Sequence, residues 1–192
     1  PDMPSSLMHI YLIEAGPRLL AGMSEESSAH AEQFLREMGV NILLNKRVVD
    51  YRDHKVVLED GTEIATRTFI WVSGVTGVTI GNLDASLIGR GGRIKVDSFN
   101  RVEGMNNVFA IGDQCIQVAD ENYPNGHPQL AQVAIQQGEL LAKNLIRMEK
   151  GQEMKPFHYR NLGSMATVGR NRAVAEFSKV KMQGWFAWVM WL

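Results

Sequence analysis

The strongest constraint on the fold is the stretch NVFAIGDQC at residues 107–115, where an apolar run ends in Gly112 and an acidic residue, Asp113, follows at once. An apolar strand that ends in Gly-Asp brings the carboxylate to the carboxyl edge of a sheet, where open α/β sheets bind their ligands. Glycine lets a ligand approach the backbone closely, and an ionised carboxylate accepts hydrogen bonds from hydroxyl groups. Asp113 is therefore a turn cap, a metal ligand or an acceptor for the hydroxyls of a cofactor. No His, Cys or acidic cluster with ligand spacing surrounds it, which disfavours the metal.

Short apolar strands alternate with helices and hairpins along the chain, and this alternation indicates an α/β architecture. One helix is predicted over 24–38, with Ser24 as its N-cap and Gly39 as its stop. A second helix is predicted over 128–146, with Pro128 in its first turn. Its apolar stripe is predicted at Ala131, Ala134, Ile135, Gly138, Leu141, Ala142 and Leu145. Strands are predicted at 8–13, 40–44, 46–50, 55–58, 68–72, 94–96 and 108–111.

Composition and charge exclude several classes of protein. With 192 residues, 45% of them hydrophobic, the chain can bury a core, and a net charge of -1 gives no reason to expect a nucleic acid partner. The single cysteine, Cys115, excludes an internal disulfide and a Cys-x-x-Cys redox pair. Residues 151–192 carry six basic and two acidic side chains, which favours an acidic or phospholipid surface as partner for that end.

A second acidic residue, Glu14, ends the predicted first strand and is followed by Ala15. An acid at the end of a strand in a dinucleotide-binding domain accepts hydrogen bonds from the adenosine ribose and repels a 2′-phosphate. A surface glutamate at a strand end is the alternative. The glycine-rich segments at 74–81 and 89–92 do not have the Gly-x-Gly-x-x-Gly spacing of a phosphate-binding loop. If Glu14 binds a ribose, the strand and glycine turn that should precede it have been lost from the chain.

The C-terminal run GWFAWVMWL, in which Trp185, Trp188 and Trp191 stand three residues apart, predicts an interfacial membrane anchor. Basic residues precede it at Arg170, Arg172, Lys179 and Lys181. The run is too short to cross a bilayer, which requires about 20 apolar residues. A helix packed in the core is the alternative. Both ends of the chain read as cut rather than capped.

Four stretches together carry a resemblance to a known family: IYLIEAGPRLL, TFIWVSGV, VFAIGDQC and HPQLAQVAIQQGELLAKNL. In this order and spacing they resemble the C-terminal half of two-dinucleotide-binding-domain flavoproteins. The AQVAIQQG motif and the tail FHYRNLGSMATVGRNRAVAEF narrow the resemblance to type II NADH:quinone oxidoreductases. The resemblance implies an α/β fold that is a fragment of a Rossmann-like flavoprotein, with β-hairpins and a membrane-associating C-terminal segment. It further implies three parts: the end of the NADH-binding domain (1–97), the end of the FAD-binding domain (98–150) and a C-terminal domain (151–192).

The resemblance also assigns residues to cofactors. Gly112 and Asp113 would bind the ribityl chain of FAD, while Glu14 and Ala15 would bind the adenosine ribose of NADH. Ser73, Gly74 and Val75 would line the junction of the two nucleotide domains. Gln132, Val133 and Ala134 would lie beside the flavin ring, where the positive end of the helix stabilises the reduced flavin. Gln132 and Gln136, four residues apart, would line the quinone pocket, with solvent exposure as the alternative for both.

The activity implied is transfer of a hydride from NADH to FAD and then of two electrons to a membrane quinone, without proton pumping. No residue of this portion is required as a general acid or base, no metal site is implied, and the fragment alone is expected to be inactive. The implied location is the cytoplasmic face of the cell membrane, and a homodimer is compatible with the resemblance. Two alternatives stay open: another FAD-dependent pyridine-nucleotide oxidoreductase, and a non-catalytic nucleotide-sensing or membrane-docking module.

Overall fold

The computed structural model describes residues 8–78, 80–177 and 180–191, and they form two compact units. The first unit contains the chain up to Trp71 together with the chain from Leu162 onward, and the second runs from Val72 to Asn161. The boundaries of these units fall at other positions than the predicted division into 1–97, 98–150 and 151–192, which stays a prediction. The C-terminal segment groups with the N-terminal one, and residues 72–97 group with the helix and turns that follow them.

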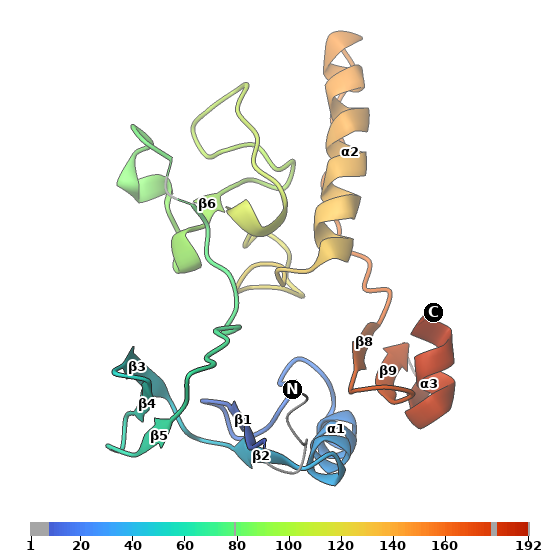
Figure 1. Cartoon of the computed structure of the whole chain (residues 1–192). Coiled ribbons are helices and arrows are strands. Elements are labelled where there is room, and N and C mark those ends of the chain that lie inside the picture. Colours follow the sequence, from blue (N-terminus) through green and yellow to red (C-terminus); the bar gives the residue numbers. More distant parts are fainter. Residues whose placement is uncertain (1–7, 79, 178–179, 192) are drawn as a thin grey trace, which may run out of the picture. The chain divides into compact units, whose positions relative to one another are not determined.

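The first unit begins with a βαβ motif, visible in blue in Figure 1. Strand β1 (Ile10–Ile13) pairs in parallel with β2 (Val40–Leu43), and helix α1 (Glu25–Glu37) connects them. The side chain of Ser24 caps α1 by accepting a backbone N–H of the first turn, as predicted. Gly39 follows the helix with a φ of 82°, a left-handed conformation that glycine adopts without steric cost. Both predicted ends of α1 are thus confirmed.

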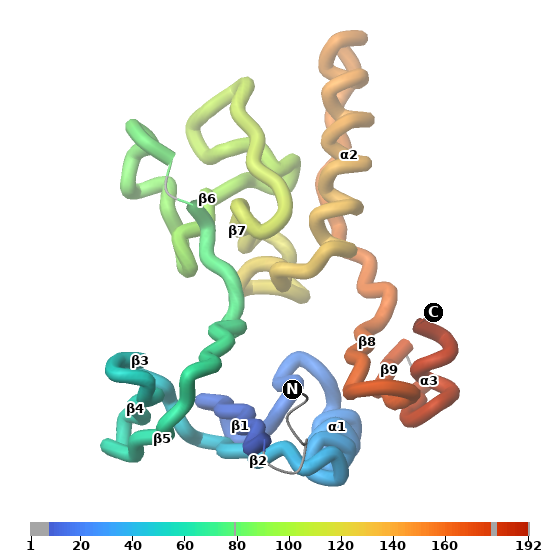
Figure 2. Tube along the Cα trace, in the orientation of Figure 1, coloured from blue at the N-terminus to red at the C-terminus, as the bar shows by residue number. Residues whose placement is uncertain are grey.

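An antiparallel meander follows the βαβ motif, and Figure 2 traces it from β2. It consists of β3 (Val48–Arg52), β4 (Lys55–Leu58) and β5 (Glu63–Ala65), in that order across the sheet. Asp53 and His54, both with positive φ, form the tight turn between the first two strands. The strand predicted at 46–50 begins two residues later, at Val48.

The C-terminal part of the first unit is a second antiparallel sheet with a helix on it. Its strands β8 (Ser164–Thr167), β9 (Ala173–Phe177) and β10 (Val180–Gln183) lie in the order β10-β9-β8. Helix α3 (Gly184–Trp191) packs against β9 (Figure 1). Small residues allow this close packing: Ala173, Ala175 and Ala187 are fully buried at the contact.

The C-terminal sheet is joined to α1 through Glu176 on β9. The Glu176 carboxylate accepts hydrogen bonds from the Ser24 backbone N–H at 2.9 Å, from the Ser27 hydroxyl at 2.6 Å and from the Ser24 hydroxyl. These hydrogen bonds stabilise the ionised form, so they lower the pKa of Glu176 below its ordinary value. A carboxylate at the positive end of α1 is also favoured by the helix dipole. The contact explains why the chain from Leu162 onward belongs to the first unit.

The second unit is built around a short parallel pair and one long helix. Strand β6 (Ile94–Lys95) pairs with β7 (Cys115–Ile116), and helix α2 (Ala131–Glu149) follows. Among the described residues of this unit, three 3-10 helices complete it: η2 (Ala85–Leu87), η3 (Arg90–Gly92) and η4 (Gly112–Gln114). Its core consists of Ile94, Val96, Val102, Ala110 and Cys115.

Two of the predicted strands are not strands in this structure. The segment 68–72 is not paired with any strand of the described residues, and Ile70 and Val72 expose 75% and 83% of their surface. The segment 108–111 makes only an isolated bridge between Phe109 and Arg101. Apolar runs of this length require neighbouring strands on which to pair, and the described part of the chain does not supply them.

The helix predicted over 128–146 is correct in type but wrong in two details. Leu130 has an extended backbone, with φ -131° and ψ 144°, so α2 begins at Ala131 and Pro128 lies outside it. The predicted apolar stripe is not the buried face: Ile135 and Leu145 expose 60% and 47% of their surface. The buried positions of α2 are instead Val133, Gln137 and Asn144. Two of these three are polar because each amide binds backbone atoms of a neighbouring segment.

Candidate functional site

The Gly112–Asp113 turn lies in η4, which packs on α2, rather than at the end of the strand predicted at 108–111. Gly112 has a φ of 63°, and a Cβ on it would lie 3.2 Å from the Cβ of Ala134. A side chain at this position would therefore be strained and crowded, which explains the glycine. Asp113 is exposed, and Gln129 donates a hydrogen bond of 3.2 Å to its backbone oxygen. The backbone is thus held while the carboxylate faces outward.

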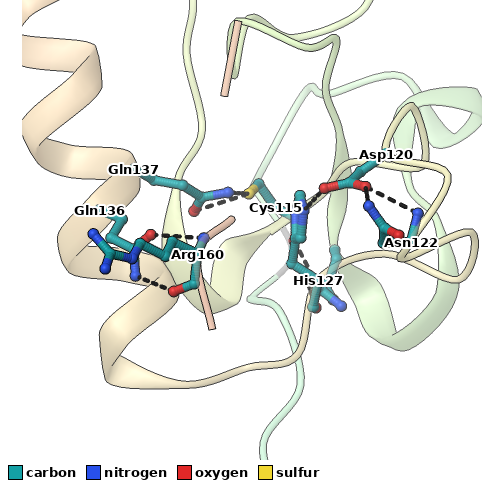
Figure 3. A network of polar contacts seen from close by, with 8 residues as sticks. Cys115, Asp120, Asn122, His127, Gln136, Gln137 and Arg160 are labelled. Carbon is teal, nitrogen blue, oxygen red and sulfur yellow. Dashed lines mark hydrogen bonds and ion pairs between the residues drawn. The ribbon is translucent and has the colours of Figure 1, made fainter. Parts of the chain in front are cut away.

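Gln137 holds this turn against α2, and the sequence reasoning missed it. Its Oε1 accepts the Gly112 N–H at 2.7 Å. Figure 3 shows the Gln137 amide beside the Cys115 sulfur, at 3.6–3.7 Å. Gln137 exposes 1% of its surface. The sequence offered only a glutamine within a predicted helix. Once that glutamine is buried, its amide requires hydrogen-bond partners. Burial raises the pKa of the Cys115 thiol, so this cysteine is a packing residue rather than a nucleophile.

The first turn of α2 brings three further predicted residues near this turn. Ala134 touches Gly112, and Val133 is buried beneath it with 3% of its surface exposed. Gln132 is half-buried in the same turn. Leu130, the N-cap, gives no side-chain hydrogen bond to the helix. The positive end of α2 is therefore not neutralised by a side-chain cap, which suits an electron-rich ligand group.

Gln136 is engaged with the chain that returns along α2. Its Nε2 donates to the Arg160 carbonyl at 2.9 Å, and its Oε1 accepts the Arg160 N–H at 3.0 Å (Figure 3). Asn144 binds the Lys155 backbone in the same two-way manner, at 2.8 and 2.9 Å. The two amides thus fix the returning segment to the helix. The predicted place of Gln136 in a quinone pocket stays a prediction.

A buried polar cluster fixes the loop that leads into α2. His127, with 1% of its surface exposed, pairs through Nε2 with Oδ2 of Asp120 at 3.0 Å (Figure 3). This hydrogen bond lowers the pKa of Asp120. Aromatic rings of Tyr123, Phe157 and Tyr159 surround the imidazole. The cluster was not predicted, because a histidine and an aspartate seven residues apart in a loop give no periodic signal.

Arg93 connects the same loop to the parallel strands. Its Nε donates to the Cys115 carbonyl at 2.6 Å, and Nη2 donates to the His127 carbonyl at 3.0 Å. Both acceptors are backbone oxygens of the second unit, on either side of the loop. Arg93 therefore fixes the two ends of the loop that separates the Asp113 turn from α2.

Glu14 and Ala15 lie at the carboxyl end of β1 in the first unit, as predicted. The Glu14 side chain is half-buried, and its Oε1 accepts the Gly16 N–H at 2.6 Å. The backbone of the same turn is held by Asn45, which donates to the Gly16 carbonyl. The carboxylate is thereby oriented at the carboxyl edge of a parallel β-pair, where a ribose would bind in a dinucleotide-binding domain.

Ser73, Gly74 and Val75 are exposed at the start of the second unit. Gly74 has a φ of 103°, which only glycine tolerates at low cost. The structure brings Gly112, Asp113, Val133 and Ala134 together around Gln137. It does not bring Ser73, Gly74 or Val75 into that cluster by any hydrogen bond among the described residues.

The tryptophans of α3 do not form one exposed stripe. Trp188 is half-buried and packs against the alanines at the contact with β9, whereas Trp185 and Trp191 expose 56% and 58% of their surface. Phe186 and Met190 are also largely exposed. Lys179, part of the predicted basic segment, lies outside the described residues. Within the described residues, no helix combines the length and apolarity needed to cross a bilayer, and no three His, Cys, Asp or Glu side chains are grouped for a metal ion.

A family model assigns the chain to a protein family. Residues 5–138 match the model described as pyridine nucleotide-disulphide oxidoreductase, and the chain belongs to this family. The predicted α/β, Rossmann-like fold class is thereby confirmed.

Individual relatives agree with the narrower resemblance. The chain is 35% identical to the type II NADH:quinone oxidoreductase NdhA of Mycobacterium tuberculosis, over 95% of this chain and 40% of the relative. It is 33% identical to the internal alternative NAD(P)H-ubiquinone oxidoreductase A1 of Arabidopsis thaliana, over 96% of this chain and 39% of the relative. The fold of NDH2 from Plasmodium falciparum, solved in complex with NADH, matches with a TM-score of 0.83 at 19% identity, over 96% of this chain and 53% of that one. The resemblance found in the sequence is confirmed, and the chain spans about two fifths of the length of these curated relatives.

Proposed function

We propose that the whole protein oxidises NADH through a bound FAD and passes two electrons to a membrane quinone, without pumping protons. The observation that carries the proposal is the Gly112–Asp113 turn, held against the first turn of α2 by Gln137, in a chain with relatives named NADH:quinone oxidoreductases. When bound, FAD supplies the chemistry of accepting a hydride and releasing electrons singly or in pairs. The residues of this chain bind, orient and shield the cofactor.

The residues at the turn fit a flavin nucleotide. At Gly112 a Cβ would fill the space beside Ala134, so the backbone is open to close approach only because the residue is glycine. The Asp113 carboxylate accepts no hydrogen bond from any residue that the structure describes, and it is exposed, so it can accept from ribityl hydroxyls. The first turn of α2, at Gln132, Val133 and Ala134, would then present backbone N–H groups to the flavin ring.

Glu14 and Ala15 are the residues proposed to bind NADH. The hydrogen bond from Gly16 orients the Glu14 carboxylate, which can accept from both hydroxyls of the adenosine ribose. Its negative charge would repel a 2′-phosphate, so the proposal specifies NADH rather than NADPH. Ser73, Gly74 and Val75 are proposed to line the junction of the two nucleotide domains.

The quinone is proposed to bind beside the first turns of α2. A neutral amide such as that of Gln132 can donate to a quinone carbonyl and accept from a quinol. Gln136 would support the same pocket, because it holds the backbone of Arg160 against α2. Leucine at position 132 should impair quinone reduction more than reduction of the flavin by NADH. Stopped-flow measurement of each half-reaction tests this, with Lys143→Gln on the same helix as control; equal loss in both half-reactions would contradict the assignment.

The membrane contact is proposed to lie in α3, on the cytoplasmic face of the cell membrane. The exposed aromatic side chains of Trp185, Phe186 and Trp191 suit the headgroup region of a bilayer. The basic side chains of Arg170, Arg172 and Lys181 precede the helix and suit anionic lipids. A homodimer is compatible with this arrangement.

The test of the function is an assay of the full-length protein. Purified with its flavin, it should oxidise NADH in the presence of a water-soluble quinone and should turn over NADPH much more slowly. Oxidation of NADH with another acceptor only would favour a different FAD-dependent pyridine-nucleotide oxidoreductase. Bound flavin without any turnover would favour the non-catalytic module.

A further inference from the structure

Gln137, a side chain of α2, binds the backbone of the Gly112–Asp113 turn. Its Oε1 accepts the Gly112 N–H at 2.7 Å, and the residue exposes 1% of its surface. On its other side Gly112 meets the Cβ of Ala134, at 3.2 Å from where its own Cβ would be. The turn is therefore fixed on α2 from two directions, by one hydrogen bond and one close contact.

The Gln137 amide is itself held in one orientation. Its Nε2 lies 3.6 Å from the sulfur of Cys115, which is 1% exposed and also lies 3.9 Å from Nδ2 of Asn100. Asn100 is equally buried. Because Oε1 also lies 3.7 Å from this sulfur, the orientation is set by the Gly112 N–H, which requires the Gln137 oxygen as its acceptor. Buried polar groups with satisfied partners rigidify their surroundings, so the three side chains form a rigid support beneath the turn.

We propose that Gln137 is a positioning residue that couples the Gly112–Asp113 turn to the first turn of α2, and thereby sets both the affinity for FAD and the reduction potential of the bound flavin. The inference rests on the proposed function. Asp113 would bind one part of the cofactor and the positive end of α2 another, and these two elements lie some twenty residues apart in the sequence. Gln137 keeps them in register, so its loss should affect the binding of the cofactor and the stabilisation of its reduced form together.

The test uses the full-length protein and four forms: wild type, Gln137→Met, Gln137→Glu and Asn144→Leu. Methionine keeps the volume and removes the acceptor, whereas glutamate keeps an acceptor for the Gly112 N–H in either protonation state. Asn144 is the matched control, because it is a buried amide on the same helix, bound to backbone, away from the turn. The dissociation constant of FAD is measured by titrating apoprotein, and the flavin midpoint potential by equilibration with redox dyes.

Gln137→Met should raise the dissociation constant of FAD by about fivefold or more, since leaving a buried donor without its acceptor costs about that factor or more. Its midpoint potential should become more negative, because the helix end no longer stabilises the reduced flavin as well. Gln137→Glu should bind FAD within about threefold of wild type, and Asn144→Leu should lose thermal stability without either change. If Gln137→Met fails to fold, an unchanged affinity and potential in Gln137→Glu still support the role of the acceptor, and a loss of affinity in Gln137→Glu well beyond about threefold overturns it.

The outcomes separate this inference from the function itself. If wild type binds FAD and reduces quinone while Gln137→Met keeps its affinity and potential, the positioning role is wrong and the function stands. Equal changes in Gln137→Met and Asn144→Leu would likewise overturn it, since they would reflect helix stability alone. If wild-type apoprotein does not bind FAD, the proposed function itself fails.

Discussion

At the scale of single residues, Gly112 combines a left-handed backbone with a close contact, and these two costs can be separated. Alanine at Gly112 would incur both the positive φ and the contact with Ala134. Gly151 is the matched control, with a φ of 66° and no atom within 4 Å of its would-be Cβ. We expect Gly151→Ala to lower the free energy of unfolding by about 1–2 kcal/mol through the backbone alone. Gly112→Ala should cost about 1–3 kcal/mol more through overpacking. Urea denaturation measures both; equal losses would show that the contact with Ala134 is relieved without cost.

Glu176 makes the stability of the first unit depend on pH. Its pKa is lowered chiefly by the hydrogen bond from Ser24, so the ionised form stabilises the folded state above the ordinary pKa of 4.5. This contribution is lost as the pH falls below about 4.5 and through the lower pKa of the folded state. Gln at position 176 should therefore cost about 1–2 kcal/mol at pH 7 and much less at pH 3. Thermal melts across this range test it.

Glu37 provides the control for this pH dependence. It forms a solvent-exposed ion pair with Arg172 at 2.7 Å, and exposed pairs contribute little to stability. Gln at position 37 should leave the pH profile of melting close to that of wild type. If the melting temperature of Glu176→Gln falls below pH 4.5 in parallel with that of wild type, other carboxylates cause the loss of stability in acid.

At the scale of whole elements, local signals account for what was predictable. Helix α1 follows from its cap at Ser24 and its stop at Gly39, and β4 follows from the turn signals on either side of it. The Asp113 turn was likewise visible from Gly-Asp after an apolar run. The buried face of α2 was not predictable by periodicity, because Gln137 and Asn144 occupy it and the apolar side chains of Ile135 and Leu145 face outward. Those two amides are explained only by backbone partners that the sequence pattern does not reveal.

Helix α3 divides its aromatic side chains between two surroundings, and this division tests the proposed membrane contact. Replacing both Trp185 and Trp191 with alanine should weaken binding of the full-length protein to anionic vesicles by about tenfold or more, since both are exposed. Trp188 packs on the sheet, so Trp188→Phe should lower thermal stability and leave vesicle binding nearly unchanged. Vesicle sedimentation at low and high salt measures the affinity. A double variant that binds as tightly as wild type would exclude α3 as the contact.

At the scale of the whole molecule, the exposure of apolar side chains is consistent with the chain spanning only part of the length of its relatives. The chain spans about two fifths of the curated relatives, and segments 68–72 and 108–111, predicted as strands, are without a sheet here. Ile70, Val72 and Ile135 expose more than half of their surface. A strand is stabilised by pairing and a helix by its apolar face, so α2 was predicted in type but not in surroundings, and the two predicted strands did not form. Residues of a longer protein would supply the missing partners.

Ile135 is therefore expected to change its role with the length of the protein. In the 192-residue chain Ile135 is 60% exposed, so Ile135→Gln should alter the free energy of unfolding by about 0.5 kcal/mol or less. In the full-length protein the same substitution would place a polar amide against an apolar neighbour and should cost about 1–3 kcal/mol. Lys143→Gln on the same helix should be neutral in both, because Lys143 is exposed and polar already. Urea denaturation of the six proteins measures this difference. A neutral Ile135→Gln in both lengths would mean that this face of α2 stays in water, and the missing partner of the helix would have to lie elsewhere.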